Sequence, residues 1–329
     1  MRKSHFIKSS LAAACICLCL MSSAPANAQE FPIKPIRLIV PNAPGAGTDI
    51  VTRLIALRLS ERWKMQVVVE NRPGGNTIIA TDLVAKSPPD GYTLLVATSA
   101  IVTNASMYTR LPYNTITDFS RISLINTSPS MIVANPSLPV KGLKELTTLA
   151  KARPGAITYG SAGYGSSQHL TMELLALKLG VKFNHVGYKG AAPVMIDAVA
   201  GHIALAISTT ASSAAYVRAG RLKALAVTSL KRNTAFPDVP TVSEQGLKNF
   251  ESLSWNGILG PRGIPETVTA KFSTEVGAIL KLVDTQERLA QLGYDPAGDS
   301  PQAFDAFFRE DLANWAKVVK DAKLDKLEQ

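Results

Sequence analysis

Residues 159–170 read YGSAGYGSSQHL, a turn rich in glycine and serine that comes just before an apolar helical pattern. Ser166 and Ser167 stand at the start of that helix, and His169 follows within its first turn. Three kinds of chemistry use such residues: a serine nucleophile beside a histidine base, a phosphate-binding loop, and a set of main-chain N–H donors for another anion.

The spacing argues against a nucleophile elbow, which requires glycine two residues before and two residues after the serine. Tyr159 stands where the first glycine would precede Ser161. Ser166 and His169 are close enough to face one another at a helix start, but no acidic residue lies beside His169 to orient it as a base. A serine hydrolase built on Ser166 or Ser167 with His169 remains the alternative function.

Cofactor and metal motifs are absent from the sequence pattern. Neither GSAGYGSSQ nor PNAPGAGTD (41–49) has the GxGxxG spacing, and no glycine-lysine-serine or glycine-lysine-threonine closes a P-loop. After residue 28 the histidines are His169, His185 and His202, and no two of them stand at ligand spacing. We expect neither a cofactor nor a metal.

An anion site made from main-chain donors fits the residues better. The first turn of a helix exposes N–H groups without helical partners, and the helix dipole adds about half a positive charge there. The segment VPNAPGAGTDIVTRL (40–54) repeats the design, with Gly45 and Gly47 in a turn before a helix that Thr48 or Asp49 opens. Each stretch alone also fits a tight turn with an N-cap. Together the two predict opposed helix N-termini that hold a small carboxylate between two lobes.

The first 28 residues have the pattern of a secretory signal. Three basic residues precede the uncharged apolar run LAAACICLCL (11–20), and APANA ends at the expected cleavage site after Ala28. The run is too short to span a membrane, which takes about 20 apolar residues. A lipid anchor at Cys15 is a weaker alternative. All three cysteines lie in this segment, so the mature chain has no disulfide.

The distribution of charge argues against a nucleic-acid-binding face. The chain has 35 basic and 25 acidic residues, a net charge of +10. Removal of the signal takes away three basic residues and leaves +7. The basic residues are dispersed and lack interleaved aromatic residues, so we expect a solvated surface without nucleic-acid partners.

Beyond residue 35, short apolar runs alternate with helical patterns. The runs predict strands at 36–40, 66–70, 92–98, 156–160, 204–208 and 222–229. The apolar spacing predicts helices at 49–63, 167–180 and 192–201, and amphipathic helices near the C-terminus. This alternation predicts an α/β protein with mainly parallel sheets flanked by helices.

Two long extended stretches interrupt the alternation, at residues 123–137 and 250–263. They suit strands by which the chain passes from one lobe to a second lobe and returns. We therefore expect a first lobe made from 29–129 and 253–329 and a second lobe made from 130–252.

The motifs in combination resemble one family, the exported solute receptors of tripartite tricarboxylate transporters, also called the Bug family. The resemblance covers nearly the whole mature chain. The pairing of ENRPGG (70–75) with PPDGYTLL (88–95) is the most specific part, and VPNAPGAGTDIVTRL, YGSAGYGSSQHLTMELL, VGYKGAAPVMIDAVAGHI and WNGILGPRGIP support it.

The resemblance implies a two-lobed periplasmic binding protein of the type II, Venus-flytrap kind, with two crossover strands. It implies a periplasmic, monomeric receptor that binds an organic carboxylate between the two glycine-rich loops without any reaction and delivers it to membrane subunits of a transporter. A receptor that feeds a signalling system is a further alternative. The site residues carried over from the family are Asn42, Ala43, Gly47, Thr48, Asp49, Thr98, Ser99, Ala162, Gly163, Ser166, Ser167, His169, Ser208 and Thr209.

Several positions depart from the family pattern. Relatives often have phenylalanine at Asn42, glycine at Ala46 and proline at Gly187, and many have an Asp-Asn pair where Ser208 and Thr209 stand. An amino-acid ligand needs an acidic partner for its ammonium group, and two hydroxyls do not provide one. We therefore expect a carboxylate without an amino group, either a dicarboxylate or an aromatic acid.

Two further residues have expected roles. Asp49 would repel an anion, so we expect it to orient loop amides or water more than to touch the ligand. We expect His169 to donate to the ligand when it is protonated.

Overall fold

The computed structural model describes residues 31–328 of the 329-residue chain. The chain divides into two units, one that ends at Ile33 and one that runs from Lys34 to Gln329, and every element below belongs to the second. The predicted signal peptide, its cleavage after Ala28 and the alternative anchor at Cys15 lie outside the described residues.

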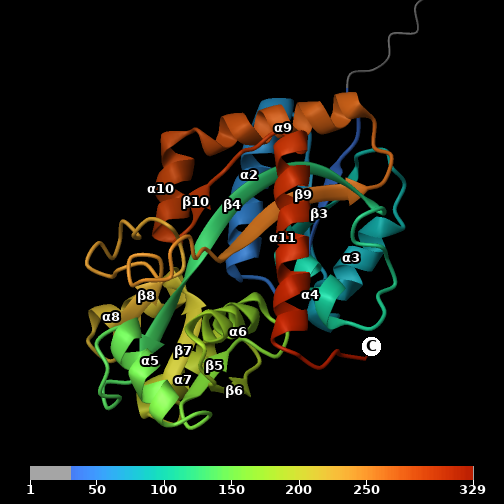
Figure 1. Cartoon of the computed structure of the whole chain (residues 1–329). Coiled ribbons are helices and arrows are strands. Elements are labelled where there is room, and N and C mark those ends of the chain that lie inside the picture. The colour runs from blue at the N-terminus through green and yellow to red at the C-terminus, as the bar shows by residue number, and fades with distance from the viewer. Residues whose placement is uncertain (1–30, 329) are drawn as a thin grey trace, which may run out of the picture. The chain divides into compact units, whose positions relative to one another are not determined.

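Three parallel strands begin the fold (Figure 1). β1 (Ile36–Val40) lies between β2 (Val67–Asn71) and β3 (Thr93–Thr98). β1 is almost entirely buried, as is usual for a parallel strand that helices cover. The connections contain α2 (Gly47–Trp63), the 3-10 helix η1 (Gly75–Thr77), α3 (Ile78–Ala85) and α4 (Ala100–Met107).

A 16-residue strand, β4 (Phe119–Ala134), pairs with strands of two groups. Up to Pro129 it pairs antiparallel with β9 (Leu253–Pro261), which also pairs antiparallel with β3. From Ser130 onward β4 pairs antiparallel with β7 (Leu205–Thr209). β4 therefore changes partner between Pro129 and Ser130, where the sequence predicts that the chain passes from one lobe to the other. The residue ranges of the two lobes remain a prediction.

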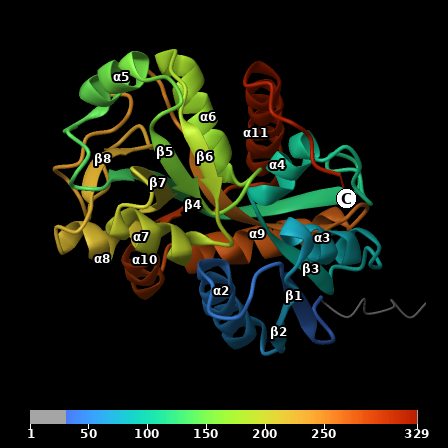
Figure 2. The ribbon, with the colours of Figure 1, turned by 90° about the horizontal axis from the view of Figure 1, so that it is seen from below.

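The second group of strands repeats the arrangement of the first (Figure 2). β5 (Thr158–Ser161) lies between β6 (Asn184–Gly187) and β7 and is parallel to both, while β8 (Lys223–Val227) pairs with β4. The helices of this group are α5 (Leu143–Ala152), α6 (Ser167–Leu179), α7 (Ala191–Ala200) and α8 (Thr210–Arg218).

The C-terminal segment returns to the first group of strands. It contains α9 (Glu266–Leu280), α10 (Val283–Gln291), the short strand β10 (Asp295–Pro296) and α11 (Pro301–Asp321). β10 pairs with β4, and α11 packs against α4, β4 and α6. The C-terminal helices predicted from the sequence are therefore confirmed.

Each group of strands has its own hydrophobic core. In the first, Trp255 of β9 makes edge contacts with Phe304 and Phe308 of α11. In the second, Tyr159 and Leu175 share one cluster, and a further cluster packs around Met131 of β4. β4 contributes buried residues to all three of these clusters, so it connects the cores of the two groups.

The six predicted strands are all present, each within two residues of the predicted bounds, and so are the three predicted internal helices. The expectation of parallel pairing is correct for the triplets β2-β1-β3 and β6-β5-β7, whereas β4 and β9 run antiparallel to their neighbours. α3, α4, α5, α8 and β6 are not among the predicted elements. No helix of residues 31–328 is long and apolar enough to cross a bilayer.

Candidate functional site

The loop after β1 leads into a helix whose N-terminus no side chain caps. α2 begins at Gly47, and its N-cap residue, Ala46, has no side chain that can accept a hydrogen bond from the first turn. Gly45 has a φ of 82°, a conformation that favours glycine. The helix therefore begins before Thr48, and the expectation that Thr48 or Asp49 opens it is corrected to Gly47. Because no side chain caps this end, its first-turn N–H groups can donate to an external acceptor.

Asp49 uses its carboxylate within the loop and its surroundings. It accepts hydrogen bonds from the Gly45 N–H at 2.9 Å, from Asn71 Nδ2 at 2.9 Å and from Arg53 Nε at 3.1 Å. Burial favours the neutral acid, but these hydrogen bonds outweigh it and hold the pKa of Asp49 below its usual value. The bond to Gly45 agrees with the expectation that Asp49 orients a loop amide.

Asn42 and Ala43 lie in this same loop. Asn71 Nδ2 donates to the carbonyl of Asn42 at 2.9 Å, and the carbonyl of Ala43 accepts from Ala46 N–H at 3.2 Å. Among the described atoms, the buried Oδ1 of Asn42 has no hydrogen-bond partner. The carbonyl groups of the loop therefore hold its conformation.

The second loop has the same design but a capped helix. Ser166 is the N-cap of α6: its hydroxyl accepts from His169 N–H at 3.2 Å and donates to the carbonyl of Gly163 at 2.6 Å. Gly163 has a positive φ of 143°. Because the Ser166 hydrogen is engaged within the loop, the donors left for a ligand are the main-chain N–H groups of Ser167 and Gln168.

His169 supports the loop instead of presenting a charge. It is 1% exposed, its Nδ1 accepts the Gly165 N–H at 3.1 Å, and its ring stacks on His185 with 4.0 Å between centroids. Burial, with a contribution from His185, lowers the pKa of His169 to about 3. The imidazole is therefore neutral near pH 7, and the expectation of a protonated donor is wrong.

The described serine–histidine contacts do not support the hydrolase alternative. The expectation that no acid lies beside His169 is wrong, because a carboxylate oxygen of Glu173 lies 3.9 Å from its Nε2. Among the described residues, however, the ring of His169 makes no hydrogen bond to Ser166 or Ser167. The hydroxyl that contacts an imidazole is that of Ser161, 2.7 Å from His185 Nε2, and Ser161 is completely buried. A buried hydroxyl of this kind cannot reach a substrate without rearrangement.

β9 contacts the start of both helices. Thr48 Oγ1, in the first turn of α2, donates to Asn256 Oδ1 at 2.8 Å. Two residues earlier on β9, Ser254 Oγ lies 3.2 Å from the Oγ of Ser167, the first residue of α6. Side chains two apart on a strand point to the same face. One face of β9 therefore brings together Thr48 and Ser167, which are far apart in the sequence.

The other predicted residues lie at the ends of neighbouring strands. Thr98 is opposite Asn256 in the pairing of β3 with β9, and Ser99 N–H donates to the carbonyl of Trp255 at 3.0 Å. In the second group, Ser208 is buried at the end of β7, and Thr209 is the N-cap of α8.

Ala162 lies beside the second loop. Its carbonyl accepts from Gly190 N–H at 3.2 Å, which ties the loop after β5 to the turn before α7. The carbonyl groups of Ala162 and Gly163 thus both accept hydrogen bonds that shape the loop.

Three residues near the two loops are not among the predicted site residues: Ser254, Asn256 and Tyr294. The Tyr294 hydroxyl is the atom that a Cβ on Gly47 would strike, and Asn256 contacts that hydroxyl. WNGILGPRGIP is one of the family motifs, and it is the available signal for Asn256. No local pattern marks Tyr294.

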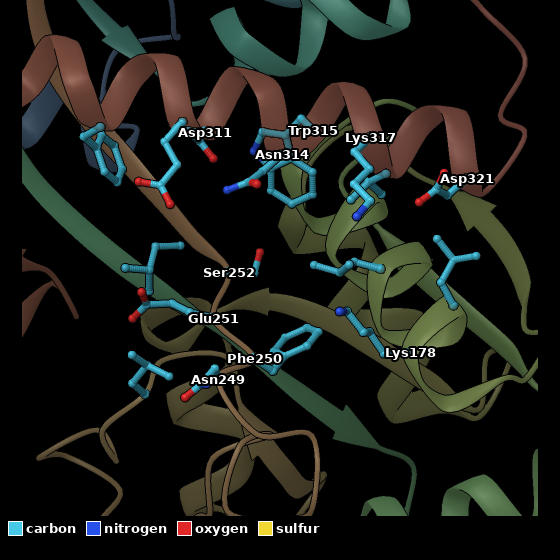
Figure 3. A pocket seen from close by; sticks show the side chains of 17 residues that line it. Lys178, Asn249, Phe250, Glu251, Ser252, Asp311, Asn314, Trp315, Lys317 and Asp321 are labelled. Carbon is cyan, nitrogen blue, oxygen red and sulfur yellow. The ribbon is translucent and has the colours of Figure 1, made fainter.

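The pocket in Figure 3 is a separate feature with a volume of about 720 Å³. It lies between α6, residues 249–253 and α11, and none of the predicted site residues lines it. Burial raises the pKa of Asp311, on its wall, to about 6. The charged lining consists of four carboxylates and two lysines: Glu251, Glu310, Asp311, Asp321, Lys178 and Lys317. This excess of carboxylates in the pocket would repel a dicarboxylate, so the chemistry favours the two loops as the anion site.

The described residues offer no evident metal centre, because residues 31–328 contain no group of three or more His, Cys, Asp or Glu side chains placed to hold an ion. The donors at the two loops are main-chain N–H groups and hydroxyls, which suit an anion.

Comparisons with known proteins show which family the chain belongs to. A family model described as "Tripartite tricarboxylate transporter family receptor" matches residues 51–324. The chain is 35% identical to Rpa4515 of R. palustris, in a structure with adipate, with a TM-score of 0.81 over 91% of this chain and 100% of that one.

Two further solved structures are similar. The periplasmic binding protein BugD is 34% identical, with a TM-score of 0.77 over 90% of this chain and 100% of that one. MatC of Rhodopseudomonas palustris, with bound malate, is 29% identical, with a TM-score of 0.75 over 88% of this chain and 100% of that one. The chain therefore belongs to the tripartite tricarboxylate transporter receptor family, which includes the Bug proteins, and has the two-lobed α/β fold of these periplasmic solute receptors.

Proposed function

We propose that this receptor binds a small organic carboxylate without an amino group, either a dicarboxylate or an aromatic acid, between the loops that precede α2 and α6. The observation that carries the proposal is the uncapped N-terminus of α2. Its free N–H groups and helix dipole favour a carboxylate oxygen. The acids bound to Rpa4515 and MatC, adipate and malate, are both dicarboxylates.

The candidate ligand-binding residues are those predicted from the sequence. Gly47, Thr48 and Ser167 supply first-turn N–H groups, and hydroxyls at the strand ends add to them. Gln168, which was not predicted, adds a further first-turn N–H group. Asp49 and His169 hold the loops in place. No acidic side chain among the candidates is left to pair with an ammonium group, because Asp49 is already paired with Arg53.

We further propose that the mature chain acts in the periplasm as a monomer, without catalysis, and passes its ligand to membrane subunits of a tripartite tricarboxylate transporter. The family supports this role. The lobes of the proposed site are residues 29–129 with 253–329, and residues 130–252.

A thermal-shift screen of the mature protein tests the proposal, with hits confirmed by calorimetry. The library should contain succinate, malate, adipate and benzoate, with aspartate and glutamate as the matched amino acids. A true ligand at a hundred times its Kd should raise the free energy of unfolding by about 2.7 kcal/mol. Tight binding of aspartate or glutamate with no response to the other acids would contradict the proposed ligand class.

A further inference from the structure

We propose that β9 and Tyr294 form a third wall of the carboxylate site, in which Asn256 is a positioning residue that holds Thr48 and Tyr294 at the N-terminus of α2. This inference rests on the proposed function. It adds Asn256, Tyr294 and Ser254 to a site that the two glycine-rich loops alone would otherwise make.

Asn256 is the centre of a buried polar network. Its Oδ1 accepts from Thr48 Oγ1 at 2.8 Å, its Nδ2 donates to Asn126 Oδ1 at 3.1 Å, and its side chain contacts the Tyr294 hydroxyl. Asn256 is 4% exposed and Asn126 is fully buried. Buried amides with several partners are held in one orientation, so Asn256 fixes the groups bonded to it.

Tyr294 lies directly against the helix N-terminus. Its hydroxyl occupies the space that a side chain at Gly47 would need, so this glycine permits the close approach. Burial raises the pKa of Tyr294, and its hydroxyl stays protonated near pH 7. A neutral hydroxyl beside the free N–H groups of α2 adds a further donor for an anion.

Ser254 extends the wall to the second loop. Its hydroxyl lies 3.2 Å from that of Ser167, the first residue of α6. Ser254 and Asn256 share one face of β9, so a single strand positions a residue from each helix start. A change in β9 should therefore alter both halves of the anion site.

The main test is the Asn256→Asp variant of the mature protein, with the strongest-binding acid of the screen as the probe. The introduced carboxylate has nearly the same shape as the amide but carries a negative charge beside the α2 N-terminus. We expect the affinity for the acid to fall at least tenfold at pH 8 relative to the wild type. The loss should be smaller at pH 5, because burial of this position raises the pKa of the introduced carboxyl and favours its neutral form at lower pH.

Other titratable groups lie near the variant position, and the comparison accounts for them. Asp49 and Tyr294 are at the same end of α2, and Asp295, the first residue of β10, directly follows Tyr294. All three are present in both proteins, so each affinity is compared with that of the wild type at the same pH. A loss in Asn256→Asp that changes with pH then reports the introduced carboxylate.

Asn135→Asp is the matched control. Asn135 is also buried and follows directly after β4, but its Nδ2 donates to the carbonyl of Ala198, near the C-terminal end of α7, instead of contacting a helix N-terminus. We expect its affinity to stay within about twofold of the wild type. A change of less than about twofold in Asn256→Asp, or an equal loss in Asn135→Asp, would overturn the inference.

Tyr294→Phe provides a second test that keeps the ring and removes only the hydroxyl. We expect the affinity to fall several-fold while the melting temperature without ligand is nearly unchanged. The corresponding control is Tyr113→Phe, in the core of the first group of strands. An unchanged affinity in Tyr294→Phe would contradict the third wall, whereas failure of every acid to bind the wild type would instead reject the proposed function.

Discussion

The hydroxyl groups of Thr48 and Ser166, at the starts of the two helices, are already engaged with the protein. Thr48 donates to Asn256, and Ser166 donates to the carbonyl of Gly163. An anion that approaches these residues therefore meets main-chain N–H groups more readily than free hydroxyl hydrogens. At the scale of single residues, glycine and serine shape the loops, and the backbone provides the donors.

The two stacked histidines give a prediction for stability against pH. Burial lowers the pKa of His169 to about 3 and that of His185 to about 4. The unfolded chain takes up protons on both residues near pH 6.5, while the folded chain does not, so the free energy of unfolding falls as pH decreases from about 6.5 to about 4. Within this range each histidine contributes a slope of about 1 kcal/mol per pH unit.

Urea unfolding of the wild type and of a His169→Gln/His185→Gln variant at pH 7, 6 and 5 checks this prediction. The variant should lose less stability than the wild type over this range. Glu173, whose carboxylate lies 3.9 Å from His169, is present in both proteins, so the comparison isolates the histidines. Equal losses in the two proteins would contradict the assignment.

At the scale of elements, the two helix N-termini differ in one respect. α2 has no side-chain cap, whereas Ser166 caps α6. Ser166 has φ −65° and ψ 156°, and Ser300, the N-cap of α11, has φ −63° and ψ 158°. Pro301 follows Ser300 directly, so the chain itself contains a proline at the position that Ser167 occupies in α6.

The similarity between Ser166-Ser167 and Ser300-Pro301 allows a test of the Ser167 N–H as a donor to the ligand. Ser167→Pro removes one N–H group at a helix position that accepts proline, after a residue that is already extended. We expect Ser167→Pro to bind the acid at least tenfold more weakly than Ser167→Ala, which loses the hydroxyl but keeps the N–H. Calorimetry measures both affinities, and thermal melting without ligand should show both variants folded. Equal affinities would mean that this N–H does not bind the ligand.

The sequence is informative where structure depends on local pattern. The predicted strands and the glycine turns before α2 and α6 are present, and Ser166 caps its helix as one of the predicted options. The role of Asn256 could not be predicted, because its contact with Thr48 joins residues 208 positions apart. The prediction for His169 is wrong, since its neutral state follows from burial against His185, which no local spacing reveals.

At the scale of the whole molecule, β4 and β9 connect the two groups of strands. β4 contributes to the three hydrophobic clusters described above, and β9 contacts a residue from each helix start. An acid bound between the loops would therefore touch both groups of strands at once. Contacts from both groups to one ligand would favour closure of the two lobes around it.

The most direct measurement is a crystal structure of the mature protein with the acid that the screen identifies. The account predicts carboxylate oxygens within hydrogen-bond distance of the N–H groups at the start of α2 and α6, near Thr48 and Ser167. An acid found instead in the pocket beside Trp315, with both glycine loops free of ligand, would contradict it.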